Sequence, residues 1–151
     1  AEVINSQGEY SDLKLRRALK NSKMLSADVN AGYDPLYAEV FEKNNSAYVG
    51  KGATISKYTG ARGKSGSNDA NAEYLGILRK AFDDAKVEYQ TAELGRIDAG
   101  GGGTIAYIPA AYGMDVIDIG VPILNMHAPY EVSSKADVYE TTKCYKAFYE
   151  M

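Results

Sequence analysis

The strongest apolar run of the chain lies between Asp115 and Glu131. It reads D-V-I-D-I-G-V-P-I-L-N-M-H-A-P-Y-E, so β-branched and aliphatic residues dominate and Gly120 and Pro122 interrupt them. A short run of this composition is typical of one or two buried strands and not of a surface helix. The run ends at His127, the only histidine in the sequence. An imidazole that follows a buried strand is a candidate site residue in an α/β protein.

Apolar residues recur at helical spacing in two earlier segments. The first segment follows Ser11, whose hydroxyl can cap a helix. The second segment ends near Asp84, and we expect Ser67 or Asn68 to cap it. Both segments therefore predict helices that turn one apolar face toward a core.

A third helix is expected from Thr104, and a fourth closes the chain. Pro109 lies within the third, so that helix must bend or begin late. In the closing helix, Ser134 and Asp137 form an approximate capping box. We expect its buried face to contain Val138, Thr142, Tyr145 and either Phe148 or Tyr149.

Segments with strand character separate these helices. They lie at 23–29, 53–58 and 87–92, in addition to the apolar run described above. The alternation of strands and helices predicts an α/β fold with a central mixed or parallel sheet. A length of 151 residues is enough for one domain with a real core.

Composition excludes several classes of partner. The net charge of -3 gives no electrostatic reason to expect nucleic acid or an anionic membrane surface. No apolar run approaches the roughly 20 residues of a membrane span. The single cysteine, Cys144, excludes an internal disulfide and fits a reducing, cytoplasmic compartment. The chain starts A-E-V-I-N without an initiator Met, so we expect it to begin inside a larger protein, unless a leader has been removed.

Three candidate site residues fall at the ends of predicted strands: Asp28, Asp98 and His127. Loops at the carboxyl ends of strands converge in an open α/β sheet, so these side chains can share one site. Imidazole nitrogen and carboxylate oxygen are ligands that suit zinc. The alternative is structural, because Asp28 can cap the next turn and a single histidine is often a hydrogen-bonded structural residue.

Two glycine-rich segments offer competing sites. Gly101, Gly103 and Ala106 satisfy G-x-G-x-x-A, with Asp118 at a distance near that of a ribose-binding acid. No apolar strand leads directly into the first glycine, and Asp118 lies inside a predicted strand, so a dinucleotide site is weakly supported. The loop T-G-A-R-G-K-S-G-S-N at 59–68 could bind an anion through its amides, but it lacks the spacing of a P-loop.

Four ordered motifs resemble one known family. They are S-A-D-V-N-A-G-Y-D-P at 26–35, R-G-K-S-G-S-N-D-A at 62–70, R-I-D-A-G-G-G-G-T-I-A at 96–106 and the segment 113–131 around M-H. They look like the C-terminal half of the catalytic domain in the aspartyl aminopeptidase and vacuolar aminopeptidase I family of zinc metallopeptidases. The closing S-K-A-D-V-Y-E-T is similar to the bacterial members. The resemblance covers nearly the whole chain and implies a three-layer α/β/α, phosphorylase/hydrolase-like zinc-peptidase fold, of which residues 1–151 form a part.

The resemblance also implies a function and a set of site residues. Family members remove the N-terminal residue of peptides with two zinc ions, and the matching metal ligands here are Asp28 and His127. Glu131 matches the acid after the histidine, which we expect to orient or neutralise it. Gly103 and Thr104 match a turn beside the active site whose backbone could hold the substrate.

Asp98 matches an acid to which we assign a structural or supporting role. The sequence departs from the family at Asn30 and Tyr33, where many members carry histidine, and a family lysine aligns with either Ser56 or Lys57. Substrate preference is therefore left open.

The larger departure is that half of the ligands are missing. The sequence has one histidine and no adjacent pair of Glu, so the first histidine ligand, the bridging Asp and the general-base Glu are expected upstream. We therefore expect a C-terminal fragment that binds zinc weakly and is inactive by itself, within a parent that assembles as a homo-oligomer, from dimer to dodecamer. The alternatives are a non-catalytic structural or interaction domain and, less favoured, a dinucleotide-binding domain.

Overall fold

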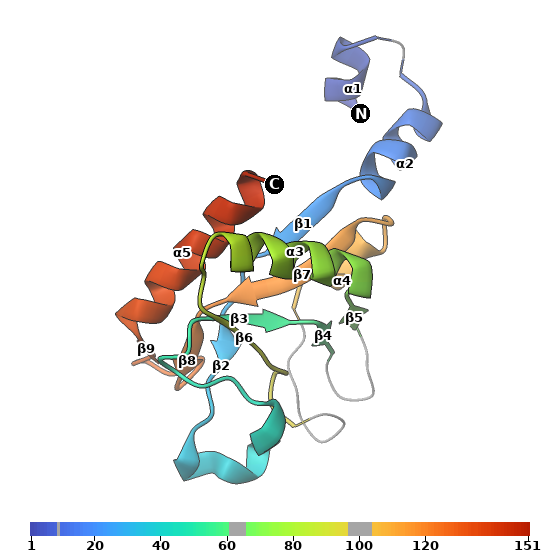
Figure 1. Cartoon of the computed structure of the whole chain (residues 1–151). Coiled ribbons are helices and arrows are strands. Elements are labelled where there is room, and N and C mark those ends of the chain that lie inside the picture. Colours follow the sequence, from blue (N-terminus) through green and yellow to red (C-terminus); the bar gives the residue numbers. More distant parts are fainter. Residues whose placement is uncertain (9, 61–65, 97–103) are drawn as a thin grey trace.

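The computed structural model describes residues 1–8, 10–60, 66–96 and 104–151 (Figure 1). Its centre is a four-stranded sheet in the order β1-β7-β3-β6, formed by Lys23–Ser26, Asp115–Gly120, Ala53–Ser56 and Tyr89–Thr91. Strand β1 is parallel to β7, β7 is antiparallel to β3, and β3 is parallel to β6. The predicted mixed sheet and the α/β class are confirmed.

The long apolar run was predicted to form one or two buried strands, and it forms two. Strand β7 is one of the two interior strands of the four-stranded sheet, and β8 (Pro122–Leu124) forms a second sheet with β2 (Asn30–Ala31) and β9 (Val132–Ser133). Strands β4 (Tyr58–Thr59) and β5 (Asn68–Asp69) form a separate antiparallel pair.

Five α-helices and two 3₁₀ helices are formed by the described residues. They are α1 (Glu2–Ser6), α2 (Asp12–Lys20), α3 (Ala72–Asp84), α4 (Tyr107–Ala110) and α5 (Lys135–Tyr149), with η1 (Pro35–Val40) and η2 (Lys43–Asn45). Helices α3 and α5 pack together on one face of the sheet, whereas α1 and α2 project from the body and bury no residue (Figure 1).

The four-stranded sheet has one apolar face and one polar face. Ile117 and Ile119 of β7 pack with Ile55 of β3 into the core beneath α3 and α5. Side chains alternate along a strand, so Asp118 points to the opposite face. Its register partners there are Ser26 of β1 and Ser56 of β3, and all three are buried. We call Ser26, Asp118 and Ser56 the polar row.

Side-chain caps begin the long helices, with one change from the sequence-based prediction. Ser11 accepts a hydrogen bond from the Lys14 amide at 3.2 Å, as predicted. Helix α3 is capped by Asn71, which accepts from the Tyr74 amide at 2.6 Å, so the prediction of Ser67 or Asn68 was wrong. Asn68 is instead buried in β5, where its side chain donates to the carbonyl of Val116.

Helix α4 is shorter than predicted. It begins at Tyr107 rather than Thr104 and ends at Ala110. Pro109 is its third residue, where a backbone N–H would have no partner within the helix. The late start predicted as one effect of Pro109 is therefore confirmed.

Helix α5 buries a face displaced by one residue from the predicted one. Ser134 caps it as predicted, accepting from the Ala136 amide at 3.2 Å, but Val138 and Thr142 are exposed. Tyr145 and Phe148 pack against the core as expected. The fully buried positions are Asp137, Thr141, Cys144 and Ala147.

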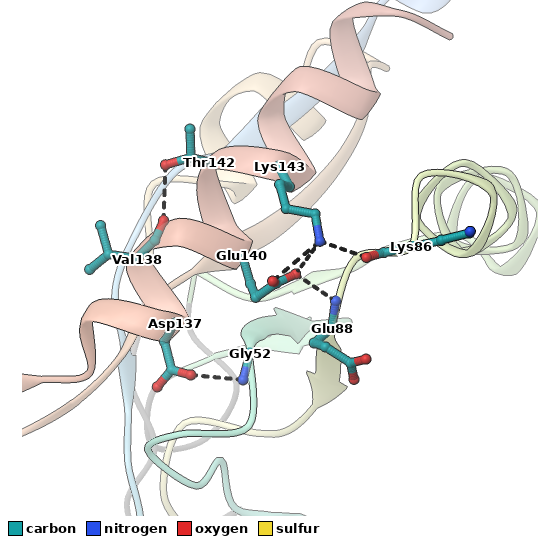
Figure 2. Close-up of polar contacts among 8 residues, drawn as sticks. All are labelled: Gly52, Lys86, Glu88, Asp137, Val138, Glu140, Thr142 and Lys143. Carbon is teal, nitrogen blue, oxygen red and sulfur yellow. Dashed lines mark hydrogen bonds and ion pairs between the residues drawn. The ribbon is translucent and has the colours of Figure 1, made fainter.

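The displaced face follows from the role of Asp137. Its carboxylate accepts the backbone N–H of Gly52 at 2.8 Å (Figure 2). It also accepts the backbone N–H of Gly50 at 2.6 Å, and it takes no part in a capping box. Gly52 has φ +85°, and a Cβ there would lie 2.1 Å from the carbonyl oxygen of Glu88. This turn therefore requires glycine, and Asp137 joins it to α5.

A second polar link joins α5 to the start of β6. The Glu140 carboxylate accepts from the Glu88 amide at 2.8 Å and from Lys143 Nζ at 2.9 Å (Figure 2). Lys143 Nζ also donates to the carbonyl of Lys86 at 2.6 Å. Partial burial acts to raise the pKa of Glu140, but the bond from Glu88 and the bond and charge of Lys143 outweigh it and lower this pKa.

We predict that Asp137→Ala lowers the free energy of unfolding by about 2–4 kcal/mol, because the buried N–H of Gly52 and the part-buried N–H of Gly50 lose their acceptor. Urea unfolding of the chain measures the change. The control is Thr142→Ala, an exposed position on the same helix, which should change stability by less than about 0.5 kcal/mol. Equal effects of the two substitutions would contradict the role given to Asp137.

We predict a pH-dependent contribution from Glu140. Its folded pKa lies below the unfolded value, so its stabilisation is present above the ordinary glutamate value of 4.5 and is lost as pH falls through the folded pKa. Wild type should therefore exceed Glu140→Gln in stability at pH 7, and the difference should shrink below pH 4.5. Unfolding at a series of pH values tests this, with Glu150→Gln as an exposed control. A difference that is constant with pH would count against it.

Candidate metal centre

Asp28 lies two residues beyond β1 and is exposed. Its Oδ1 accepts from the Val29 amide at 2.8 Å, which orients the carboxylate. The backbone of Asp28 runs against Gly120, where a Cβ would lie 1.5 Å from the Asp28 carbonyl oxygen. Glycine at position 120 therefore allows the close approach that fixes the position of Asp28 beside β7.

His127 lies in the loop between β8 and β9 and is also exposed. Its φ is +68°, a left-handed conformation that residues other than glycine seldom adopt. Glu131 Oε1 accepts the backbone N–H of His127 at 2.7 Å. Glu131 therefore holds the main chain that carries the imidazole. Strained backbone of this kind is concentrated at functional sites.

The predicted site residues are only partly brought together. Asp28 precedes β2 and His127 follows β8, the neighbouring parallel strand, and no hydrogen bond joins the two within the described residues. In the described ranges no three His, Cys, Asp or Glu side chains meet as a metal-binding group. Asp98 and Gly103 lie outside the described residues.

Thr104 is buried and contacts Asp118, a residue that the sequence analysis did not assign to metal binding. Its Oγ1 lies 3.0 Å from Asp118 Oδ2 and accepts from the Ala106 amide at 3.1 Å. Asp118 is 3 % exposed. The sequence feature that could have singled out Asp118 is its position as an aspartate within a buried, otherwise β-branched strand.

The surroundings of Asp118 raise its pKa above the ordinary aspartate value. Burial is the largest cause, and the charge of Asp28 acts in the same direction. The hydroxyls of Ser26 and Thr104 oppose the shift by stabilising the anion. Because Asp118 points into the interior from within β7, it does not have the exposed position after a strand that a ribose-binding acid requires.

A cavity of about 250 Å³ borders the loop that carries His127. It has a largely apolar lining with one carboxylate, from Ala31, Gly32, Asp34, Tyr37, Val40, Phe41, Ile123, Asn125 and Met126. In the described part of the chain, no helix is both long and apolar enough to cross a membrane.

The fold is that of known aminopeptidases. The crystal structure of aminopeptidase I from Clostridium acetobutylicum matches with a TM-score of 0.87 and 61% identity, over 96% of this chain and 31% of that one. The M18-family aminopeptidase of Thermotoga maritima matches with a TM-score of 0.88 and 44% identity, over 94% of this chain and 32% of that one. The fold class expected from the sequence is thereby confirmed.

Sequence comparison identifies the family. The profile described as aminopeptidase I zinc metalloprotease (M18) matches residues 2–149, so the chain belongs to the M18 family. The probable M18 family aminopeptidase 1 of Clostridium acetobutylicum is 62% identical over 148 residues, which are 98% of this chain and 32% of that protein. The chain thus spans about a third of the length of the relatives it matches.

We predict opposite effects from two glycine substitutions. Gly120→Ala should destabilise by about 3 kcal/mol or more, since the new methyl group would collide with a backbone carbonyl. Gly76→Ala, within α3 and with no atom near the added methyl, should stabilise by about 0.5–1 kcal/mol. Chemical denaturation of both variants measures this. A Gly120→Ala variant as stable as wild type would show that β7 and Asp28 do not approach closely.

Proposed function

We propose that this chain is the C-terminal part, residues 1–151, of the catalytic domain of a zinc aminopeptidase that hydrolyses the N-terminal residue of peptides. Membership of the M18 family supports the reaction class. The observation that carries the site is His127, the only histidine, held exposed in a left-handed conformation by the bond to Glu131.

The donor set of the chain fits zinc but does not complete a site. An exposed imidazole and an exposed carboxylate, from His127 and Asp28, are suitable zinc ligands. Among the described residues, no group of three His, Cys, Asp or Glu side chains forms around Asp28 or His127. We therefore assign the remaining ligands and the general-base Glu to polypeptide outside this chain. Asp28 would bind one of two ions and His127 the other, so no direct contact between them is required.

The residues of the chain have separate parts in this mechanism. Two zinc ions, if bound, would supply an activated water and polarise the carbonyl of the peptide bond. His127 and Asp28 would hold the ions, and Glu131 fixes the loop of His127 by accepting its backbone N–H. By the family resemblance, Gly103 and Thr104 would hold the backbone of the substrate, and Asp98 would have a supporting role. None of these groups transfers the proton, which is the task of a Glu outside the chain.

We further propose that the parent enzyme works in the cytoplasm as a homo-oligomer. The single buried cysteine is compatible with a reducing compartment. The S. cerevesiae mApe1 dodecamer shares the fold, with a TM-score of 0.73 at 23% identity over 97% of this chain and 31% of that one. Assembly is therefore a property to test on the full-length polypeptide.

We predict that Asp28→Asn and His127→Ala, made in the full-length polypeptide, each remove about one zinc ion and lower peptidase activity at least about 100-fold. Zinc content by elemental analysis and hydrolysis of short peptides measure the two effects. Asp84→Asn, an exposed carboxylate on α3, is the control and should change neither.

Two outcomes would contradict this proposal. If both variants keep their zinc and activity, the non-catalytic structural domain is the better description of the chain. If the 151-residue chain alone hydrolyses peptides in a metal-dependent reaction, the assignment of the general base to another segment is wrong.

A further inference from the structure

Asp118 is a buried carboxylate without a cationic partner among the described residues. It forms none of the ion pairs seen there, and its Oδ1 has no hydrogen-bond partner among them. A buried carboxylate in such surroundings costs several kcal/mol in stability, on the order of the penalty for any unpaired buried charge. A group with this cost needs an explanation outside the folding of the sheet.

Asp118 connects the segments around the candidate metal centre. In the polar row it lies between Ser26, two residues before Asp28, and Ser56, whose hydroxyl accepts from Asn30 Nδ2 at 2.5 Å. Asp118 Oδ2 also accepts a hydrogen bond from the hydroxyl of Thr104. One carboxylate thus contacts the strand that leads into the Asp28 loop and the segment that follows the glycine-rich run.

The charges of Asp28 and Asp118 also connect Asp118 to the candidate metal centre. The backbone of Asp28 lies against Gly120, two residues beyond Asp118, and the charge of Asp28 contributes to raising the pKa of Asp118. Without a metal, the two carboxylates repel each other. A divalent cation held by Asp28 would replace this repulsion by attraction, because both acids then face a positive charge.

We infer that Asp118 is a positioning residue for the metal held by Asp28, which it supports through its negative charge and through its contacts with Ser26 and Thr104. The inference rests on the proposed function, since it requires zinc at Asp28. It adds a residue that touches neither metal nor substrate and whose charge increases zinc affinity at the expense of the stability of the metal-free fold.

The test is Asp118→Asn in the full-length polypeptide, which keeps the shape and removes the charge. We expect zinc affinity, measured by competition with a chelator, to fall about 10- to 100-fold. Urea unfolding after removal of zinc should show a metal-free protein at least as stable as wild type. A purely structural residue would give the reverse, with lower stability and unchanged affinity.

The matched control is Thr54→Val, which is equally buried on the polar face and removes a hydroxyl without a partner in the described chain. It should leave zinc affinity within twofold of wild type. If Asp118→Asn does not fold, Thr104→Val removes the hydroxyl at Asp118 Oδ2 and should lower zinc affinity about threefold or more.

Each result decides between the two proposals. Unchanged zinc affinity in Asp118→Asn, or in Thr104→Val if the first variant is unfolded, overturns the inference and leaves the proposed function intact. A wild-type polypeptide that binds no zinc overturns the proposed function itself. Weaker zinc binding with undiminished metal-free stability supports both.

Discussion

The structure depends on the close contact between β7 and the segment that leaves β1. Because Gly120 has no side chain, the backbone of Asp28 lies against the end of β7. This contact places an exposed carboxylate at the edge of a sheet whose other face packs its isoleucines beneath α3 and α5. It also fixes the register in which Ser26 and Asp118 face each other. The same backbone contact therefore serves both the packing of the sheet and the position of the candidate site. A substitution at this contact affects both.

The two candidate ligands are held by different physical means. Asp28 is placed by strand pairing and by the Gly120 contact, both of which belong to the core. His127 is placed by a loop whose backbone is strained and whose amide is held by one carboxylate, Glu131. The backbone of the first contacts Gly120, which is part of the close-packed interior. The second depends on one exposed hydrogen bond, so the histidine side of the centre can adjust when the rest of the site is present.

Much of the fold was readable from local pattern, and less of the site. The buried strands at 115–124 and the caps Ser11 and Ser134 follow from composition and short-range hydrogen bonding, and they were predicted correctly. The buried face of α5 was missed because Asp137 is bonded to glycine amides 85 and 87 residues away, a contact that helical periodicity does not contain. The same holds for Asp118. Its partners Ser26 and Thr104 belong to other segments, so only the three-dimensional arrangement shows that it joins the strand before Asp28 to the segment of Thr104.

The strand order has a consequence for how the chain acquires its structure. The first strand of the central sheet pairs with β7, and the register partners Lys23 and Asp115 are 92 residues apart. Until β7 has been synthesised, β1 lacks the one neighbour that the described residues give it in that sheet. Closing so long a loop costs conformational entropy before strand pairing can stabilise it, so such sheets form slowly. The Asp28 segment therefore reaches its final position late, after the ribosome has passed Gly120, and an unpaired β1 is the part of the nascent chain most exposed to incorrect association.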